Sequence, residues 1–472
     1  MQRLASRIDA GWERLAFVNS VLGSKTSGAV VSVLVIQSFG ALLSYVAQIS
    51  LARWMGPSSY GLYTYAIGWA MSLSIVACLG MHHNVLRYVP QYLAKGEWPQ
   101  LKAIIQLSVC LLLASASSLG LLAGMVVWLF ASPTTKQSLL IGMFIVVAAA
   151  IARVQRDNLR ALGRVNASVV VDLVVRPVFL LSAAFLVVQA VRPLSVSLAV
   201  ACNALAFILA SVILSILVRS ATPAIARRVS AARKNREWLQ SAISMAAGSA
   251  LVAAGGEIDL LLSGYILGAQ TIGPYQAARR TALFVTFVLL AVNTAGAPVI
   301  SAFHAQRKQE ALQRTLTELV HISFWPSLLS SGVICLLGKM ILGLFGAKFI
   351  FAYDALIILV VGELISTGHG SVGTVLQVTG FQRLNNYILG FAMLLQLTLS
   401  LILIPVWRTK GAAFAVVVAQ IATCVLRHRA VVRELGLHPS IIRATFGRDM
   451  HLRYRTTQKA APEVAAQRVG RP

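Results

Sequence analysis

The sequence predicts an all-α polytopic membrane protein, with about 12 transmembrane helices in two pseudo-symmetric six-helix lobes. Of its 472 residues, 57% are hydrophobic and only 12% are charged, and the mean hydropathy is +0.76. A soluble globular domain carries about 25% charged residues, so a large water-soluble surface is excluded. Long apolar runs follow one another along the chain, and one glycine–tyrosine motif occurs twice at matching places. These observations together predict two like bundles of membrane helices.

The apolar runs set the expected positions of the membrane spans, because a spanning helix needs about 20 predominantly apolar residues. The twelve expected spans are roughly 28–51, 61–80, 103–130, 138–154, 169–190, 194–218, 239–264, 274–300, 318–343, 354–378, 385–406 and 411–428. Two more polar segments, 81–101 and 301–316, are expected to be interfacial helices. Residues 1–27 are expected to form a cytoplasmic amphipathic N-terminal segment, because apolar residues recur there at helical spacing among arginines.

A repeated connector motif divides the chain into two like halves. The pattern Gly-x4-Gly-x-Tyr occurs once in each half, and each copy joins the first two apolar runs of its half. The matching pairs are Gly56 and Gly268, Gly61 and Gly273, Tyr63 and Tyr275, and Ala66 and Ala278. We therefore expect an N-lobe at 28–218 and a C-lobe at 239–428, joined by a basic cytoplasmic linker at 219–238. Six spans per half predict parallel repeats, related by an axis along the membrane normal.

The basic residues predict the orientation of the spans. With the N-terminus in the cytoplasm, 31 of the 41 Lys and Arg residues lie in cytoplasmic connectors and tails, six lie on the opposite side, and four lie within spans. This asymmetry places both termini in the cytoplasm, including a basic tail at 429–472. The formal charge of +26 is concentrated in connectors, where it faces anionic membrane lipids, so a nucleic-acid partner is excluded.

Ionisable residues inside the spans are candidates for function, because each costs about 2.5–3.5 kcal/mol at mid-membrane. Asp172 and Arg176 are four residues apart and share a helix face, so they can pair. The pair has two interpretations, a neutralised structural contact or a functional site. Pro177 predicts a kink at this point.

Three further arginines lie at one end of the spans. Arg279 and Arg280 are adjacent and point about 100° apart, so one can line a cavity while the other reaches the outer interface. The alternative is that both reach the interface, as long basic side chains commonly do. Arg53 ends the first span at the same level, where the interface is the favoured interpretation over ligand binding.

Carboxylates in the second half are candidates for ion coupling or for lining a cavity. Glu257 and Asp259 lie in the seventh span with no basic residue nearby in sequence, and Glu363 lies in the tenth. An unpaired carboxylate in an apolar helix can bind a proton or a cation such as sodium. The alternative is that each is neutral or is paired to an arginine from another helix.

A basic stripe is expected at the cytoplasmic mouth of the fourth span. Arg153, Arg156 and Arg160 follow helical spacing and share one face. Such a stripe suits the phosphate oxygens of a substrate, and it suits anionic lipid head groups equally. His82 and His83 are expected at a helix end in the cytoplasmic interface.

Enzyme signatures are absent from the sequence. There is no Walker loop, no H-E-x-x-H and no serine or cysteine nucleophile set, so the chain is predicted not to be an enzyme. The five cysteines lie in apolar runs without metal-ligand spacing, so no metal site and no cofactor is expected. Transport would then depend on a coupling proton or sodium ion, on the membrane potential, or on a partner.

Several segments resemble bacterial polysaccharide flippases, the O-antigen (Wzx-type) transporters. The first connector carries the resemblance at residues 51–63, LARWMGPSSYGLY, and the start of the second half carries it in IDLLLSGYILG at 258–268 and TIGPY at 271–275. VLQVTG at 375–380 and GAAFA at 411–415 also fit. The resemblance implies the multidrug/oligosaccharidyl-lipid/polysaccharide exporter fold, with a central cavity and alternating access.

The same resemblance implies a function and a site. Undecaprenyl-diphosphate-linked oligosaccharide would cross from the inner to the outer leaflet of the bacterial inner membrane, for O-antigen, lipopolysaccharide or exopolysaccharide synthesis. A cationic cavity would bind the diphosphate through Arg279 and Arg280, and Asp259 matches the family's acidic position in the seventh span. Arg176 and Arg53 follow no family pattern, and they are added as candidates on the argument from residues. A polysaccharide polymerase and chain-length proteins are expected partners.

Two other functions remain open at this point. A multidrug cation exporter of the same superfamily would use carboxylates in its cavity, and Asp172, Glu257, Asp259 and Glu363 are present. A non-transporting scaffold of a polysaccharide assembly complex would tolerate loss of the arginines.

Overall fold

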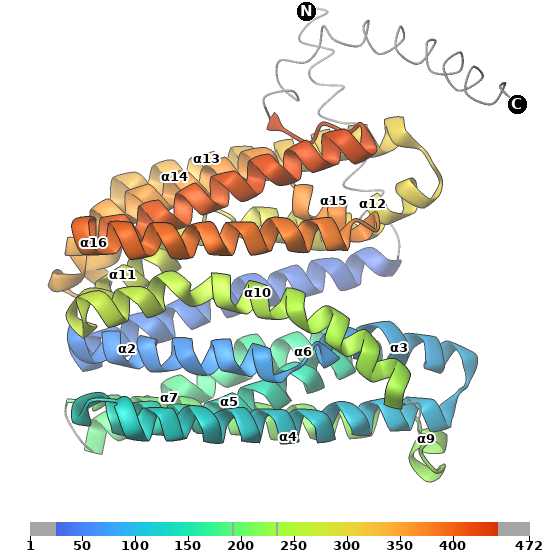
Figure 1. Ribbon diagram of the computed structural model, residues 1–472, viewed down its shortest axis with the longest axis horizontal. Helices are drawn as coiled ribbons and strands as arrows, with labels where there is room; N and C mark the ends of the chain where they lie inside the picture. Colours follow the sequence, from blue (N-terminus) through green and yellow to red (C-terminus); the bar gives the residue numbers. More distant parts are fainter. Residues whose placement is uncertain (1–24, 191–192, 233–234, 442–472) are drawn as a thin grey trace, which may run out of the picture. The chain divides into compact units, whose positions relative to one another are not determined.

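The computed structural model describes residues 25–190, 193–232 and 235–441 of the chain. Within these ranges the regular elements are all helices, with no strand (Figure 1). The predicted N-terminal segment falls almost wholly outside the described residues, as does most of the predicted tail. The all-α fold class is confirmed.

The helices up to the middle of the chain are joined by short connectors. In order they are α2 (Lys25–Ala77), α3 (Met81–Lys95), α4 (Trp98–Phe130), α5 (Pro133–Ala161), α6 (Val165–Val170), the π-helix η1 (Val171–Val175), α7 (Arg176–Ala190), α8 (Val196–Ala221), α9 (Ala224–Arg228), α10 (Asn235–Leu267) and α11 (Ala269–Ala282). The remaining elements are α12 (Phe287–Ala305), α13 (Gln309–Phe345), the 3₁₀ helix η2 (Ala347–Ala352), α14 (Tyr353–His369), α15 (Val372–Val378) and α16 (Gln382–Leu435).

These helices accommodate the twelve predicted spans. Among the described residues, eight helical stretches are long and apolar enough to cross a membrane, or nine if α11 and α12, which bend by 51° at their junction, form one span. Two of them hold two predicted spans each: α2 is broken at Gly56 (φ 76°) and α16 at Arg408 (φ 52°). The more polar α10 supplies the remaining span.

The helices form two compact units by contact. Over the described residues, the first unit takes in the chain up to 280 together with 337–356 and 393–415, and the second takes in 281–336, 357–392 and the part from 416 onward. The units therefore divide α11, α13, α14 and α16 between them. The lobe bounds at 28–218 and 239–428 stay a prediction.

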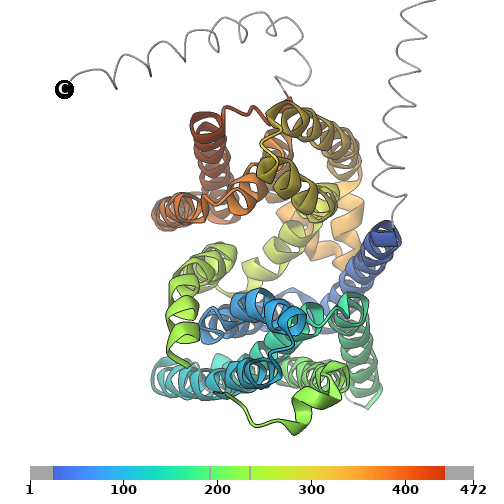
Figure 2. The ribbon, with the colours of Figure 1, turned by 90° about the vertical axis from the view of Figure 1, so that its right-hand side faces the viewer.

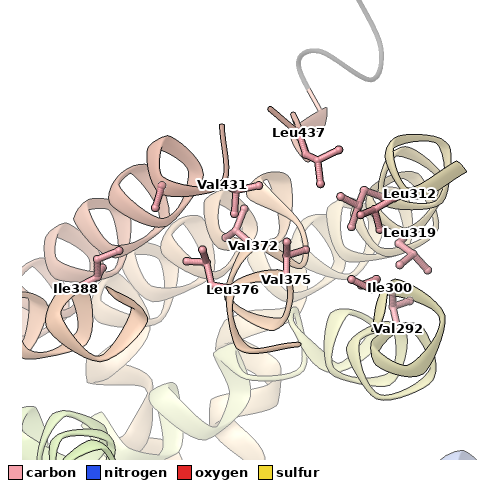
Figure 3. Packing of buried hydrophobic residues seen from close by; sticks show 12 residues of the cluster. Val292, Ile300, Leu312, Leu319, Val372, Val375, Leu376, Ile388, Val431 and Leu437 are labelled. Carbon is pink, nitrogen blue, oxygen red and sulfur yellow. The ribbon is translucent and has the colours of Figure 1, made fainter. Parts of the chain in front are cut away.

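Each unit has its own packing. In the first unit α5 contacts α2, α4 and α8, so it is a central helix, and Figure 2 shows these helices end-on. In the second unit an apolar cluster joins α12, α13, α15 and α16 (Figure 3). Val375, Leu376 and Val431 are fully buried in that cluster. Close packing of these side chains fixes α15 against its neighbours through van der Waals contact.

The predicted linker is anchored to the first unit. Trp238, at its end, is fully buried, and its indole Nε1 donates to Tyr92 Oη over 2.9 Å. Asn84 Nδ2 donates to the Trp238 carbonyl over 2.7 Å. Lys102 Nζ donates to the carbonyls of Arg227 (3.0 Å) and Val229 (2.9 Å), which stabilises the end of α9.

Two segments depart from the sequence-based expectation. The interfacial helix predicted at 301–316 is wrong, because α12 continues to Ala305, turns at Arg307 (φ 55°), and is followed at once by α13. The span predicted at 354–378 ends at His369, since Gly370 takes φ 68° and α15 starts as a separate helix. The segment predicted at 81–101 does contain a separate helix, α3, which begins and ends beside left-handed glycines.

Candidate functional site

The two copies of the connector motif have the same backbone geometry. Gly56 and Gly268 have φ angles of 76° and 78°, which only glycine adopts readily, and each ends one helical segment before the next begins. Tyr63 and Tyr275, the tyrosines of the two copies, are both fully buried. Asn203 Nδ2 donates to Tyr63 Oη over 2.7 Å, whereas Tyr275 Oη donates to Asp259 Oδ2 over 2.7 Å. The two copies of the sequence motif therefore share both the conformation of the first glycine and the burial of the tyrosine.

Arg279 is held by acceptors from α10 and α11. Its Nη1 lies 2.9 Å from Glu257 Oε2, and its Nε lies 3.4 Å from Asp259 Oδ2. Its Nη2 donates to the carbonyl of Gly256, and its Nη1 also faces Gln276 Oε1 at 3.4 Å. Asp259 is only 1% exposed. Of the two interpretations of Glu257 and Asp259, pairing with an arginine from another helix is the one that the structure has.

Arg280 differs from its neighbour in having no such partner. Its side chain is exposed, and it makes no hydrogen bond or ion pair within the part of the chain that the structure describes. It acts electrostatically on the buried hydroxyls of Tyr60 and Tyr63. Since consecutive helical residues point about 100° apart, fixing Arg279 on α10 turns Arg280 away from it. The adjacent pair thus contains one neutralised and one available guanidinium.

Arg176 and Asp172 form the predicted ion pair, and Asp172 also pairs with Arg156. Asp172 Oδ1 lies 3.4 Å from Arg176 Nε, and Asp172 Oδ2 lies 2.8 Å from Arg156 Nη1. The Arg176 guanidinium also stacks over the Phe207 ring at 4.6 Å. Asp172 belongs to η1, the π-helical turn that precedes Pro177, whose missing N–H disturbs the regular α-helical ladder there.

The basic stripe on α5 is largely ion-paired. Asp157 Oδ1 lies 3.4 Å from Arg156 Nε and 3.4 Å from Arg160 Nη1. Sequence reasoning missed Asp157, although its spacing of three residues from Arg160 indicated a possible pair. Arg153 Nε is buried and has no hydrogen-bond partner among the described residues. The stripe is therefore part of an alternating chain of charges that reaches Asp172 and Arg176.

Two histidines of α3 border this network. Burial, with smaller contributions from His83, Arg153 and Arg156, lowers the pKa of His82 to about 3. Burial also lowers the pKa of His83, against an opposing effect of Asp157. The two rings lie 4.1 Å apart between centroids.

The two remaining candidates have other surroundings. Arg53 is exposed, and its Nε donates to the carbonyl of Leu344 over 2.6 Å, near the end of α13. Glu363 belongs to the second unit, where its Oε2 accepts from Gln420 Nε2 over 3.1 Å. Neither is brought to the other candidates by any described contact.

Two of the first unit's candidate cations act electrostatically on the hydroxyl of Tyr63. Its hydroxyl is under the electrostatic influence of both Arg176 and Arg280, which come from α7 and α11. Among the charged candidates of this unit, taken with Asp157, there are seven arginines and four carboxylates, which leaves a net charge of +3. The arginines are Arg53, Arg153, Arg156, Arg160, Arg176, Arg279 and Arg280, and the carboxylates are Asp157, Asp172, Glu257 and Asp259. Such an arrangement suits an anion.

Two family models match the chain. The model described as a polysaccharide biosynthesis protein matches residues 28–304, which is more than half of the chain. The MatE model matches residues 244–402. No curated protein matches the sequence.

Solved structures with similar folds include both transporters and a flippase. An inward-facing multidrug resistance transporter of the MATE family, within the MOP superfamily, matches with a TM-score of 0.63 at 14% identity, over 83% of this chain and 96% of that chain. The lipid II flippase MurJ, in an inward closed conformation, matches with a TM-score of 0.66 at 12% identity, over 85% of this chain and 87% of that chain. A MOP superfamily transporter from Pyrococcus furiosus, described by the reversed polarity of its binding pocket, matches with a TM-score of 0.60 at 16% identity. The match covers 86% of this chain and 95% of that chain. At such identities the similarity shows the fold.

Proposed function

The chain belongs to the family of polysaccharide biosynthesis proteins, and we propose that it is a flippase for an undecaprenyl-diphosphate-linked oligosaccharide. It is a multi-pass membrane protein with the fold of MOP superfamily transporters and flippases. In this proposal it acts in the bacterial inner membrane, with both termini cytoplasmic, and moves its substrate from the inner to the outer leaflet for O-antigen, lipopolysaccharide or exopolysaccharide synthesis. It is a transporter rather than an enzyme.

The chemistry of the substrate explains why a cation is needed. A diphosphate and its sugars cannot cross hydrocarbon unaided, because an unpaired charge and unbonded hydroxyls are costly in an apolar medium. A guanidinium can bond phosphate oxygens through two parallel N–H groups and stays charged in any environment. The polyprenyl tail needs no such help and can stay among the lipid chains.

The exposed and unpaired guanidinium of Arg280 is the observation that carries the proposal. Arg176 acts on the same tyrosine and is the second candidate for the diphosphate, once its shared carboxylate Asp172 is displaced. Arg279 has the position expected of a ligand but is already neutralised by Glu257 and Asp259. We assign it the role of fixing α11 on α10, so that Arg280 faces outward.

A multidrug cation exporter is the second candidate function. The MatE family model and the MATE-type neighbours favour it. Binding of an organic cation would need a free carboxylate. In the first unit Asp172, Glu257 and Asp259 each contact an arginine, so the charge left available there is positive. This polarity is why we place the flippase first.

The test compares a strain that lacks the gene with the wild type. Polyprenyl-linked lipids are extracted, and glycan-diphosphate carriers are quantified together with surface polysaccharide. Accumulation of completed lipid-linked units with loss of surface polymer, both reversed by the wild-type gene, is the expected result. Unchanged carriers and polymer with new sensitivity to cationic drugs would favour the exporter instead.

Complementation with point variants then separates a flippase from a scaffold. Arg280→Ala is expected to leave the protein in the membrane at normal amounts but to lower surface polymer at least about 10-fold, since a hydrogen bond to a charged group contributes about 1.5–3 kcal/mol. The matched control is Arg314→Ala, an exposed arginine of α13 without a described ion pair, which should complement fully. A scaffold would tolerate both changes.

A further inference from the structure

Arg427 of α16 differs from the other lysines and arginines of the second unit in being partly buried. The others that the structure describes in this unit are all exposed, namely Arg307, Lys308, Arg314, Arg383, Arg429 and Arg433. Exposure is the usual state of a long basic side chain near the end of a span, because its charged group extends to water. Arg427 also lies near such an end, since the span predicted at 411–428 stops at the next residue, yet its Nε is buried. This departure indicates a specific role.

The guanidinium of Arg427 lies against the main chain of α15 at Gly373. A Cβ added to this glycine would lie 3.0 Å from Arg427 Nη1 and 3.2 Å from Arg427 Cζ, so a larger residue would push the guanidinium away. The buried Nε has no hydrogen-bond partner among the described residues. Beyond it, Nη1 and Nη2 form the fork through which a guanidinium bonds two oxygens of an anion.

Within the part of the second unit that the structure describes, Arg427 has no counter-ion. It forms no ion pair there, and the Glu363 carboxylate accepts instead from Gln420 Nε2 over 3.1 Å. The side chain that acts on Arg427 electrostatically is the Cys424 thiol, which carries no charge in its protonated form. An arginine stays charged in any protein environment, and a partly buried charge without a partner is costly. An anion bound from outside these residues would supply the missing charge.

Imidazoles rather than carboxylates gather at the end of α16 next to Arg427. The ring of His428 lies 6.0 Å from that of His369 and 6.5 Å from that of His438, between centroids. His438 is fixed by Gln313, whose Oε1 accepts from its main-chain N over 2.8 Å and whose Nε2 donates to its carbonyl over 3.1 Å. An imidazole adds no negative charge and can donate a hydrogen bond to an anion. The described His, Cys, Asp and Glu side chains form no cluster that could hold a metal ion, so these surroundings favour an anion.

We propose that Arg427 is the centre of a phosphate-binding site at the end of α16 that is predicted to be cytoplasmic. The guanidinium fork matches the oxygens of a phosphate group and bonds them through two parallel N–H groups. Arg427 lies at the predicted end of its span, which is the depth at which lipid head groups carry their phosphates. The phosphate comes either from such a head group or from a small soluble phosphate compound, since both present the same oxygens. The site does not rest on the proposed flippase activity, because Arg176 and Arg280 belong to the first unit.

Binding of phosphate probes to the purified full-length protein tests the site. The delipidated protein in a neutral detergent is titrated with dioctanoyl phosphatidylglycerol or with inorganic phosphate, and the affinity is read from the rise in unfolding midpoint. We expect Arg427→Gln to weaken binding at least about 10-fold, because hydrogen bonds between charged groups are lost. The matched control Arg429→Gln removes the same charge from an exposed position of α16 and should change the affinity by less than about 2-fold. Equal losses in the two variants, or a wild type that binds neither probe, would overturn the site.

The two probes and a third compound identify the source of the phosphate. Inorganic phosphate that displaces the lipid would show that a soluble phosphate is sufficient, whereas binding of the lipid alone assigns the site to a head group. Dioctanoylglycerol has the same acyl chains without the phosphate, and it should not stabilise the protein. Stabilisation by dioctanoylglycerol equal to that by phosphatidylglycerol would contradict a phosphate site.

Unfolding without probes separates a ligand site from a structural contact. Arg427→Gln removes a charge that has no described counter-ion, so the ligand-free variant should be at least as stable as the wild type. Gly373→Ala keeps every charge but pushes the guanidinium from α15, and it should weaken binding at least about 3-fold. Its control is Gly332→Ala, an exposed glycine at which a Cβ meets nothing within 4 Å. A less stable Arg427→Gln together with unchanged binding in Gly373→Ala would make Arg427 a structural residue.

Discussion

Tyr63 and Tyr275 occupy equivalent places in the two copies of the connector motif, yet their hydroxyls play opposite roles. The Tyr63 hydroxyl accepts a hydrogen bond from the neutral amide of Asn203, and the Tyr275 hydroxyl donates one to the carboxylate of Asp259, each over 2.7 Å. The repeat has kept the fold of the connector in both halves. Only the second copy carries the charged cluster, because the residues that match Arg279 and Arg280 in the first copy are Ile67 and Gly68.

The first prediction is that the two tyrosines differ in their contribution to stability. Tyr275→Phe should cost about 1.5–3 kcal/mol, because it removes a charge-assisted hydrogen bond from a carboxylate that is 1% exposed. Tyr63→Phe should cost about 0.5–1.5 kcal/mol, since its partner is uncharged. Thermal unfolding in detergent, followed by size-exclusion fluorescence, measures both. Equal losses in the matched pair would contradict the described hydrogen bonds.

The second prediction separates the adjacent arginines by stability rather than by transport. Arg279→Ala should destabilise the protein by about 3–5 kcal/mol, because Glu257 and Asp259 are left without their cation. Arg280→Ala should change stability by no more than about 0.5 kcal/mol, as expected for an exposed side chain without a partner. The same unfolding assay compares them. If Arg280→Ala unfolds as readily as Arg279→Ala, the division of roles between them is wrong.

The sequence predicted those features that depend on local spacing and composition. Gly56 and Gly268 marked the ends of helical segments because positive φ angles favour glycine, and both take them. Asp172 and Arg176 were paired through their spacing of four residues, which places both on one helix face. Hydropathy alone located the spans, since the membrane requires continuous apolar helices.

Features that depend on the path of the chain between helices could not be predicted. Glu257 and Arg279 are 22 residues apart, on two helices joined at Gly268, so their pairing was one of two open interpretations. The helix expected at 301–316 failed because polarity marks the end of a span without showing whether the chain turns or continues as a helix. The contact of the Arg427 guanidinium with Gly373 needed the three-dimensional path as well, since the two residues lie on different helices.

The third prediction concerns Asp172, whose carboxylate pairs with both Arg156 and Arg176. A double-mutant cycle between Arg156→Ala and Asp172→Ala should give a coupling free energy of about 1 kcal/mol, because the 2.8 Å pair is about one quarter exposed and partly screened. The control cycle pairs Asp172→Ala with Arg164→Ala, an exposed arginine that makes no described contact with Asp172. That cycle should couple by less than about 0.5 kcal/mol. Coupling of similar size in both cycles would mean a general effect of charge rather than a direct pair.

The fourth prediction is a loss of stability in acid that depends on His82. Burial lowers the pKa of this side chain to about 3, with His83, Arg153 and Arg156 adding to the effect, whereas an unfolded histidine titrates near about 6.5. Between these values the unfolded chain binds a proton that the folded chain does not, so the contribution of His82 is fully present above about pH 6.5 and is lost as pH falls toward 3.

Unfolding midpoints measured from pH 7.5 down to pH 5 test this, with His82→Gln as the variant that removes the titration while keeping a polar side chain. The wild type should lose more stability over this range than the variant, by a slope that corresponds to up to about one proton per molecule. The lowered pKa of His83 acts in the same direction and should leave a smaller slope in the variant. Recovery of the midpoint on return to pH 7.5 serves as the control for irreversible change. Parallel profiles for the two proteins would show that His82 is not held neutral by its surroundings.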